Sequence, residues 1–287
     1  MNNSFNNSSD NNRNKLSAKP ILWIVLISAI AIFACVAVAA CPSKNGSASK
    51  SKQPGVKHYD GLEKVINPPG KASRLKKYEG FTVSFNRDNA TPNWTVWELL
   101  GSETDGIESR SNRFWQDDEI DGCPHTSDYK NSNYDRGHLA PAADMKWSSK
   151  AMKDCFSLAN ICPQAHKLNS GAWKTLEDKC RIWAKRDSAI VIIAGPIYEP
   201  SDKKRIGTNG VRVPSAFFKV ILAPYTNEPR AIGFIYPNRE CYGNMRDYSM
   251  TVDEVERITG YDFFSSLPDN IENDIESRAS FTEWNKR

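Results

Sequence analysis

The sequence lacks an excess of charge of either sign over most of its length. Residues 1–54 hold six of the 38 Lys and Arg and one of the 34 Asp and Glu, which leaves 32 basic and 33 acidic side chains in residues 55–287. A basic character of the whole domain therefore cannot be used to argue for nucleic-acid binding. Any site for anions must be local.

The sequence also lacks an internal repeat, a GxGxxG segment and a P-loop. These absences argue against repeat architectures and against the usual nucleotide-binding loops. What is present is an ordinary globular composition, with 39% hydrophobic and 25% charged residues. This composition excludes a mainly disordered or fibrous protein, and the length predicts one or two domains.

Residues 21–40 contain no charged side chain. Twenty apolar residues are enough to cross a bilayer as a helix. The next residue is Cys41, and Val38-Ala-Ala-Cys41 resembles a lipoprotein cleavage box. An uncleaved anchor helix and a lipoprotein signal both remain open. Either interpretation predicts association with a membrane through residues 21–41 and a domain on the extracytoplasmic side.

Composition divides the chain into four parts. We expect a polar N-terminal segment (1–20), a transmembrane or lipoprotein signal segment (21–41), a flexible tether (42–75) and a globular domain (76–287). The tether is expected because small and polar residues with Pro and Gly follow the apolar run.

Five short runs rich in β-branched and aromatic residues predict strands in the domain, at 81–85, 94–97, 189–194, 217–222 and 231–236. Helical spacing of apolar residues predicts an amphipathic helix over 168–185. Thr251 and Glu254 form a capping-box pattern, so a second helix is expected to end at Gly260, and a third is expected near 269–277. Because strands and helices do not alternate strictly, the pattern favours an α+β fold over a doubly wound sheet.

Five cysteines lie in the domain, and an odd number leaves at least one thiol without an intramolecular partner. Cys123 and Cys162 each have a nearby histidine, at His125 and His166. Together these four side chains are candidates for a structural zinc site, although neither pair has the usual finger spacing.

The residue types suited to chemistry concentrate between Tyr134 and Glu177. In Asp135-Arg136-Gly137-His138 an acid, a guanidinium and an imidazole surround one glycine. Imidazole can accept a proton near neutral pH, and the planar guanidinium matches phosphate oxygens.

Further along the chain, Asn169, Trp173 and Glu177 follow one another at intervals of four residues. On a regular helix they would share one face, with Trp173 in the core. Asn and Glu oxygens are hard ligands suited to Mg²⁺. A rise of about 12 Å over eight helical residues argues against direct ligation by both Asn169 and Glu177.

Three motifs in this order resemble those of the DNA/RNA non-specific endonuclease family. They are DRGHLAPAAD at 135–144, NICPQ at 160–164 and LNSGAWKTLE at 168–177. The resemblance covers about residues 76–270. It implies the ββα-metal (His-Me finger) nuclease fold, an α+β architecture in which helices flank a central, mostly antiparallel sheet.

The resemblance also implies roles for single residues. His138 resembles the general base, and Asn169 resembles the direct protein ligand of a hydrated Mg²⁺, with Mn²⁺ as an alternative. Glu177 resembles an acid that holds this metal through water. The remaining predicted site residues are phosphate-contacting Arg136 and Arg113, with Arg110 as a nearby alternative to Arg113, and the additional polar group Asn160.

The implied activity is metal-dependent hydrolysis of DNA and RNA that leaves 5′-phosphate ends. Contacts to backbone phosphate rather than to base edges would give low sequence selectivity. A homodimer is compatible with the resemblance. Two alternatives remain: a catalytically inactive relative that only binds nucleic acid, and a zinc-stapled interaction module at a membrane surface.

Overall fold

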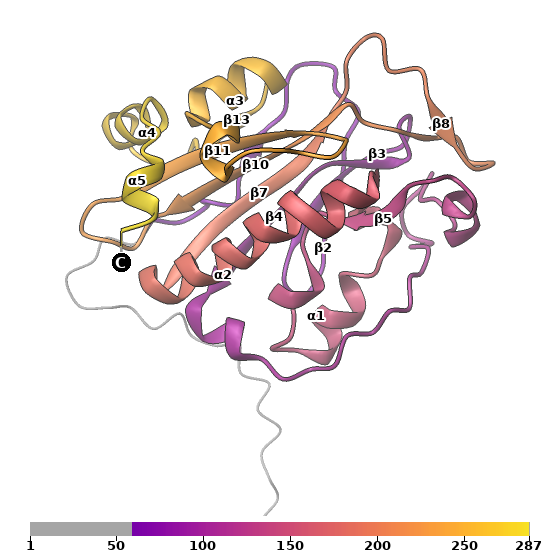
Figure 1. Cartoon of the computed structure of the whole chain (residues 1–287), viewed down its shortest axis with the longest axis horizontal. Coiled ribbons are helices and arrows are strands. Elements are labelled where there is room, and N and C mark those ends of the chain that lie inside the picture. Colours follow the sequence, from indigo (N-terminus) through magenta and orange to yellow (C-terminus); the bar gives the residue numbers. More distant parts are fainter. Residues whose placement is uncertain (1–58, 287) are drawn as a thin grey trace, which may run out of the picture. The chain divides into compact units, whose positions relative to one another are not determined.

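A seven-stranded sheet forms the centre of the computed structural model, which describes residues 59–286 (Figure 1). The predicted segments 1–20 and 21–41 and the first part of the predicted tether lie outside the described residues. The strand order is β12 (Ser249–Met250), β11 (Arg230–Pro237), β10 (Ala216–Ala223), β7 (Ala189–Ile197), β4 (Thr91–Leu100), β3 (Thr82–Asn86) and β2 (Arg74–Lys77). Every neighbouring pair is antiparallel, which confirms the predicted central antiparallel sheet.

The apolar runs form strands without polar alternation because both faces of the sheet are covered. In β7, Ile190 and Ile192 belong to one hydrophobic cluster, whereas Val191 and Ile193 belong to a second cluster on the opposite face. Successive side chains of a strand point to opposite faces. The sheet is therefore the middle layer between two sets of covering elements.

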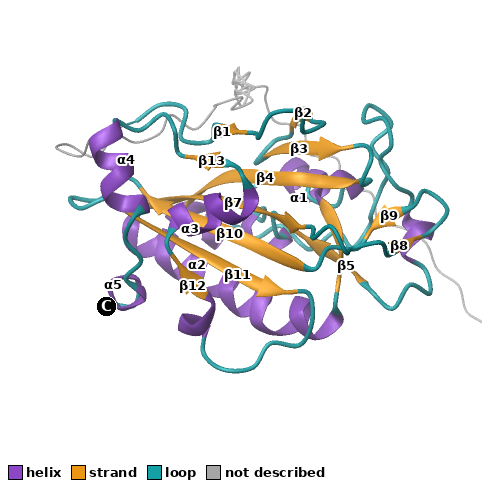
Figure 2. Ribbon diagram, turned by 90° about the horizontal axis from the view of Figure 1, so that it is seen from above, coloured by secondary structure: helices purple, strands orange, loops and turns teal. Residues whose placement is uncertain are grey.

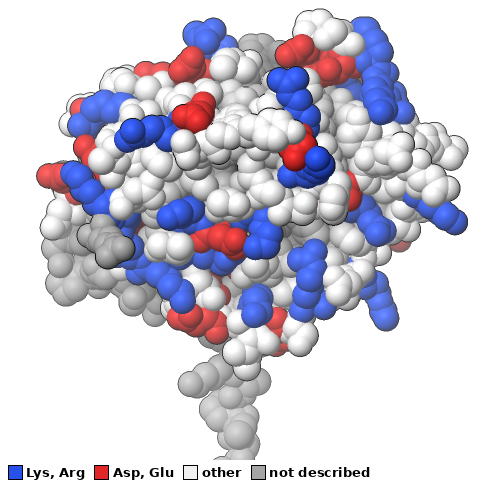
Figure 3. Space-filling model, in the orientation of Figure 1, with Lys and Arg blue, Asp and Glu red and all other residues white. Residues whose placement is uncertain are grey.

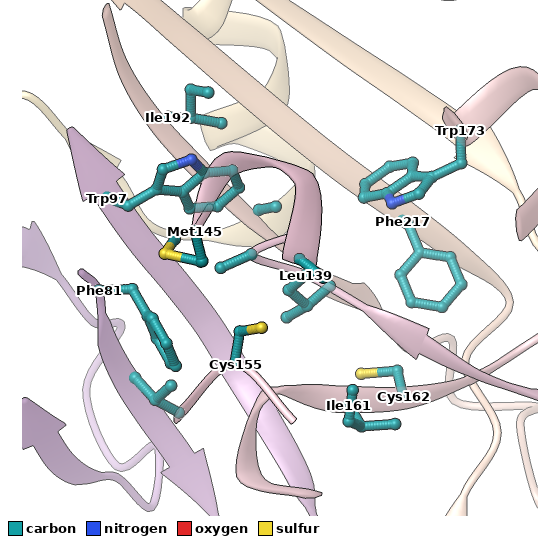
Figure 4. Close-up of a cluster of buried hydrophobic side chains, with 14 of the residues drawn as sticks. Phe81, Trp97, Leu139, Met145, Cys155, Ile161, Cys162, Trp173, Ile192 and Phe217 are labelled. Carbon is teal, nitrogen blue, oxygen red and sulfur yellow. The ribbon is translucent and has the colours of Figure 1, made fainter. Parts of the chain in front are cut away.

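One face is covered by a long helical segment made of a π-helical turn, η5 (Leu168–Trp173), and α2 (Lys174–Asp187). Its buried side chains are the predicted ones: Trp173, Leu176, Cys180, Trp183 and Ala184. Figure 4 shows Trp173 in this core together with Trp97 of β4 and Ile192 of β7. The first turn is not regular, however, because Gly171 has φ −110° and ψ −110°. The spacing argument that assumed one straight α-helix from Asn169 to Glu177 therefore fails.

The other face is covered by α3 (Val252–Thr259), α4 (Asp269–Glu276) and a two-stranded ribbon of β1 (Val65–Ile66) and β13 (Asp262–Phe263). Figure 2 looks down on this face. Thr251 caps α3 by accepting the backbone N–H of Glu254, and Gly260 ends it with φ +74°. Both boundaries agree with the predicted helix.

The predicted tether differs from the structure over residues 59–75. Val65 pairs with Phe263 in the β1–β13 ribbon, and Leu62 is buried in the second cluster. The indole of Trp94 also donates a hydrogen bond to Asn67 Oδ1 at 2.8 Å. These few apolar and polar anchors are enough to place the segment on the sheet, although its composition is that of a linker.

The shorter elements pack around this frame. Two small ribbons pair β5 (Asp135–His138) with β6 (Ile161–Gln164) and β8 (Arg205–Ile206) with β9 (Val211–Arg212). The other helices are η1 (Gly101–Asp105), η2 (Thr126–Tyr129), η3 (Ala142–Asp144), α1 (Ser149–Asp154), η4 (Leu158–Asn160), η6 (Met245–Tyr248) and α5 (Phe281–Trp284). In Figure 1, β5 lies beside the N-terminal end of the helical segment that leads into α2.

Candidate active site

His138 is the last residue of β5, where it pairs with Ile161 of β6. Its ring is 8% exposed and lies edge-on to Phe156, with 4.8 Å between the ring centroids. The ring of Phe114 lies 5.3 Å away on another side. Within the described part of the chain, the buried Nε2 atom has no hydrogen-bond partner. A buried polar atom without a partner is costly, and such atoms mark sites where a ligand or water is expected.

The surroundings of His138 keep its ring neutral. Burial lowers the pKa of His138 to about 3, and the positive charges of Arg110 and Arg136 contribute in the same direction. At neutral pH the imidazole therefore has a free lone pair. This is the state required of a proton acceptor.

Two guanidinium groups lie on the aromatic rings that surround His138. Arg136 stacks over Phe114 at 4.4 Å from the ring centroid, and Arg110 stacks over Phe156 at 5.1 Å. Arg110, Arg113 and Arg136 are all exposed, but the charge of the predicted Arg113 is not among those that act on His138. Arg110, three residues earlier, is thus the arginine of this stretch whose charge acts on the imidazole of His138.

Gly137 allows β5 and β6 to approach closely at this point. A Cβ atom at Gly137 would lie 2.3 Å from Oε1 and 2.5 Å from Cβ of Gln164. These distances are below any real contact, so a larger residue would push β5 away from β6. The glycine of the DRGH motif thus fixes the position of the strand that carries His138.

Asp135 and Asn169 meet at the other end of β5. The amide Nδ2 of Asn169 donates a hydrogen bond of 2.8 Å to Oδ2 of Asp135. Nδ1 of His166 lies 2.9 Å from the same oxygen. This bond uses the nitrogen of the Asn169 amide and leaves its oxygen, Oδ1, available for a ligand. No donor contacts Oδ1 within residues 59–286. A free amide oxygen held in one orientation suits a hard cation.

A cavity of about 610 Å³ lies beside Asp135, Arg136 and Asn169, whereas His138 is not among its lining residues. Its lining comes from β5, η2, η5 and the segment before β5, and comprises Phe114, Thr126, Ser127, Tyr129, Lys130, Tyr134, Asp135, Arg136 and Asn169. The cavity thus brings together the DRGH strand and the Asn169 turn, as the motifs predicted.

Asn160 has a different position from the one that the resemblance implied. Its side chain is fully buried, and Nδ2 donates to the backbone oxygens of Ala140 (2.9 Å) and Cys155 (3.0 Å). Oδ1 accepts the backbone N–H of Ala140 at 3.0 Å. Because every polar atom of Asn160 bonds to the backbone, the side chain fixes the turn that follows His138. It has no free polar atom for substrate.

Glu177 lies on α2, half-buried. Burial raises the pKa of Glu177 to about 7; the positive charge of Lys219 opposes this rise, whereas the negative charge of Asp144 adds to it. Near neutral pH the carboxyl is therefore close to half-ionised in the absence of a cation. A bound cation would favour the charged form.

Sequence reasoning missed a buried charge network beneath Glu177. The Lys219 side chain is fully buried in β10, and its Nζ lies 4.4 Å from the ring centroid of Trp173 and 5.4 Å from that of Trp97. Asp144 accepts hydrogen bonds from Trp97 Nε1 (3.1 Å) and Arg181 Nη1 (2.7 Å). The only signals in the sequence were a lysine within an apolar strand and an arginine four residues after Glu177.

The alternative zinc site does not form among the described residues. Cys123 and Cys162 are buried free thiols, and all five cysteines of residues 59–286 are unpaired. Within this range, the only group of three or more His, Cys, Asp or Glu side chains close enough to share an ion consists of Asp253, Glu256 and Glu276.

Comparison with known proteins decides the family. The model of the DNA/RNA non-specific endonuclease family matches residues 59–270. The chain belongs to this family. It is 32% identical over 222 residues to Nuclease 1, mitochondrial, of Schizosaccharomyces pombe, which covers 70% of this chain and 69% of that protein. It is also 32% identical to the protein called Nuclease from Nostoc sp. over 215 residues, 69% of this chain and 76% of the relative.

A solved structure agrees with the family assignment. A chain from the crystal structure of the EndoG/EndoGI complex matches with a TM-score of 0.64 and 28% identity, over 68% of this chain and 87% of that one. The endonuclease family accounts for the mixed α/β fold with its central antiparallel sheet. Its members are metal-dependent enzymes that act on nucleic acids.

The comparisons contradict the expected location. An anchored or lipidated domain on the extracytoplasmic side was expected from residues 21–41, which lie outside the described residues. Relatives from two yeasts and the mouse are named as mitochondrial nucleases instead. In residues 59–286, no helix is both long and apolar enough to span a bilayer. An apolar N-terminal segment alone was too weak a basis for assigning a compartment.

Proposed function

We propose that this endonuclease hydrolyses the phosphodiester bonds of both DNA and RNA with low sequence selectivity, with His138 as general base and a metal held by Asn169. The observation that carries the proposal is the unpartnered Nε2 of a neutral His138, set between two stacked guanidinium groups. A buried base with no partner and adjacent cations is suited to deprotonating a water molecule beside a phosphate.

In this proposal, His138 Nε2 takes one proton from the attacking water as its oxygen bonds to phosphorus. The bond from phosphorus to the 3′ oxygen breaks, and that oxygen gains a proton from solvent, which leaves a 5′-phosphate end. Phe114 and Phe156 exclude water from the ring faces of His138. The proposal places the attacking water at the buried Nε2, which has no other partner among the described residues.

The residues present fit a hard divalent cation. Asn169 offers an oriented amide oxygen beside the Asp135 carboxylate, and all of these ligand types suit Mg²⁺ or Mn²⁺. Glu177 is placed in the proposal as a carboxylate that holds the ion through water. When bound, the ion would stabilise negative charge on the phosphate and on the leaving oxygen.

Arg136 and Arg110 would bind the phosphate oxygens on either side of the scissile bond. Stacking on Phe114 and Phe156 fixes the two guanidinium planes before substrate arrives. Arg113, which is exposed, would contact a phosphate further along the strand. Lys and Arg side chains are mixed with acidic ones on the face drawn in Figure 3, so binding would depend on these local groups rather than on a broad basic surface. Phosphate contacts carry no base information, hence the low selectivity.

Cleavage of plasmid DNA and of a structured RNA by the purified protein tests this function. The proposal predicts cleavage of both substrates with Mg²⁺, no cleavage with a chelator, and no cleavage by the Asn169→Ala variant. Asn285→Ala, an exposed asparagine in the C-terminal turn, is the matched control and should cleave at the wild-type rate. A folded wild-type protein that binds but never cleaves either substrate would instead identify an inactive relative.

A further inference from the structure

Three acidic side chains converge on the sheet face opposite α2. Asp253 and Glu256 are one turn apart on α3, and Glu276 is the last residue of α4. One carboxylate oxygen from each lies within 4.8 Å of the other two. Figure 1 shows α3, α4 and β13 on the side of the sheet away from α2.

Glu276 gives this group a second, independent feature. Its side chain is only 4% exposed, yet its Oε1 has no hydrogen-bond partner in the described part of the chain. A buried carboxylate without a donor is strongly unfavourable. Its position in the last turn of a helix adds to the cost, because the negative end of the helix dipole is there.

No basic side chain offsets this negative charge. Within residues 59–286, none of the three acids forms an ion pair, and Glu272 and Asp262 add two further carboxylates to the neighbourhood. The charge of Lys64 acts on Asp262 and is not among those that act on Glu276 or Glu256.

We propose that Asp253, Glu256 and Glu276 bind a Ca²⁺ ion that joins α3 to α4, at a site separate from the active site. Three carboxylates from two elements, one of them exposed, leave room for the waters that complete a Ca²⁺ shell of six to eight oxygens. Glu256 Oε1 already accepts the backbone N–H of Phe263 at 2.7 Å, so this ligand is held in place by β13. The smaller Mg²⁺ demands a regular octahedron that a group divided between two helices is poorly suited to supply.

The site would be structural rather than catalytic. Val255 of α3 and Ile275 of α4 pack in the cluster on this face of the sheet, whereas His138 contacts the cluster that includes α2. A cation here would hold the C-terminal layer on the sheet. It would leave cleavage under saturating Mg²⁺ unchanged.

Thermal unfolding with Ca²⁺ and with chelator tests the proposal. All arms use the Asn169→Ala background, which removes the proposed ligand of the catalytic metal. We expect millimolar Ca²⁺ to raise Tm by about 5 °C through mass action. Glu276→Gln should abolish this rise, and its Tm in chelator should equal or exceed that of its parent, because a neutral amide of the same shape replaces a buried carboxyl that lacks a partner. Glu254→Gln, an exposed acid of α3, is the matched control and should keep the rise.

Asp253→Asn provides a second variant whose folding is not in question, since Asp253 is exposed. It should weaken Ca²⁺ binding at least tenfold in calorimetric titration. The proposal is overturned if Ca²⁺ gives no rise in Tm, if the rise persists in Glu276→Gln, or if Mg²⁺ alone produces it. None of these results bears on nuclease activity, which is measured separately with Glu276→Gln in Mg²⁺.

Discussion

Asp135 accepts the side-chain N–H of Asn169 in a hydrogen bond of 2.8 Å, and this contact joins the two motifs of the active site. Asp135 opens the DRGH strand, whereas Asn169 lies 34 residues later in the turn before α2. The bond settles which amide atom of Asn169 faces the cavity. In a metal-dependent family, a carboxylate that orients a ligand in this way affects metal affinity although it need not touch the metal.

Replacing Asp135 should therefore weaken metal binding, and so raise the Mg²⁺ concentration that the enzyme requires, rather than abolish folding. For Asp135→Ala we expect a loss of about 10–100-fold in activity at limiting Mg²⁺, partly restored at high Mg²⁺. The measurement is the Mg²⁺ concentration at half-maximal cleavage rate. Asp121→Ala, which loses only an exposed ion pair with Arg87, serves as control. An unchanged Mg²⁺ requirement in Asp135→Ala would show that the bond has no such role.

The buried His138 predicts a specific dependence on pH. In the unfolded chain a histidine has a pKa of about 6.5. Folding lowers the pKa of His138 to about 3, so below pH 6.5 the unfolded state binds one more proton than the native state. Stability should fall as pH drops from 6.5 towards 3. His138→Phe should lose this part of the acid sensitivity in urea unfolding at pH 7 and pH 5. NMR of the imidazole should show a neutral ring at pH 5, and a ring that titrates near 6.5 would contradict the structure.

Asn160 is expected to matter for stability more than for chemistry. Asn160→Ala would leave the backbone groups of Ala140 and the oxygen of Cys155 without their partners in a buried turn. We expect a loss of at least about 2 kcal/mol in the free energy of unfolding. The folded fraction should still cleave DNA within about tenfold of wild type. If a stable Asn160→Ala protein were as inactive as a His138 variant, a direct role at the substrate would be indicated.

Lys219 links the core to the proposed metal carboxylate. Lys219→Met removes the ammonium group between Trp97 and Trp173 and leaves Asp144 and Glu177 with less positive charge nearby. Nζ of Lys219 has no hydrogen-bond partner among the described residues, so we expect its loss to change the free energy of unfolding by no more than about 1 kcal/mol. The pKa of Glu177 should also rise above its present value of about 7, so the acidic limb of the pH–rate profile should move to higher pH. If Lys219→Met lowers stability but does not move the acidic limb of the pH–rate profile, Lys219 contributes to packing only and does not affect the pKa of Glu177.

The spacing of apolar residues in the sequence was enough to predict the helices and strands that are long and largely buried. β7, β10 and β11 are apolar along their length, and the buried face of α2 repeats at helical spacing. Strand order could not be deduced, because it depends on contacts between distant residues such as Thr95 and Ala194. β2 was missed since its residues, Arg74-Leu-Lys-Lys77, form an exposed edge strand without an apolar pattern.

The candidate site could be located from its motifs, but the details of its charges could not. The structure joins Asp135 of the first motif to Asn169 of the third by a hydrogen bond, and the roles predicted for His138 and Asn169 remain predictions. A single lysine in an apolar strand gave no sign that Lys219 would be buried between two indoles. Arg110 and Arg113 are equivalent by composition, and only the stacking on Phe156 distinguishes them. Asn160 was predicted to be a site residue because it belongs to a family motif. A motif can contain residues that support the site as well as residues that contact the substrate, and the sequence does not distinguish the two.

The central claim is that the unpartnered Nε2 of His138 removes the proton from the attacking water. The most direct test is single-turnover cleavage of DNA under saturating Mg²⁺ by wild type, His138→Ala and the matched control His125→Ala, an exposed histidine. We expect His138→Ala to slow cleavage by about 10²–10⁴-fold while its circular dichroism and DNA binding stay unchanged. His125→Ala should cleave as the wild type does. A folded His138→Ala protein that cleaves at the wild-type rate would show that His138 is not the general base.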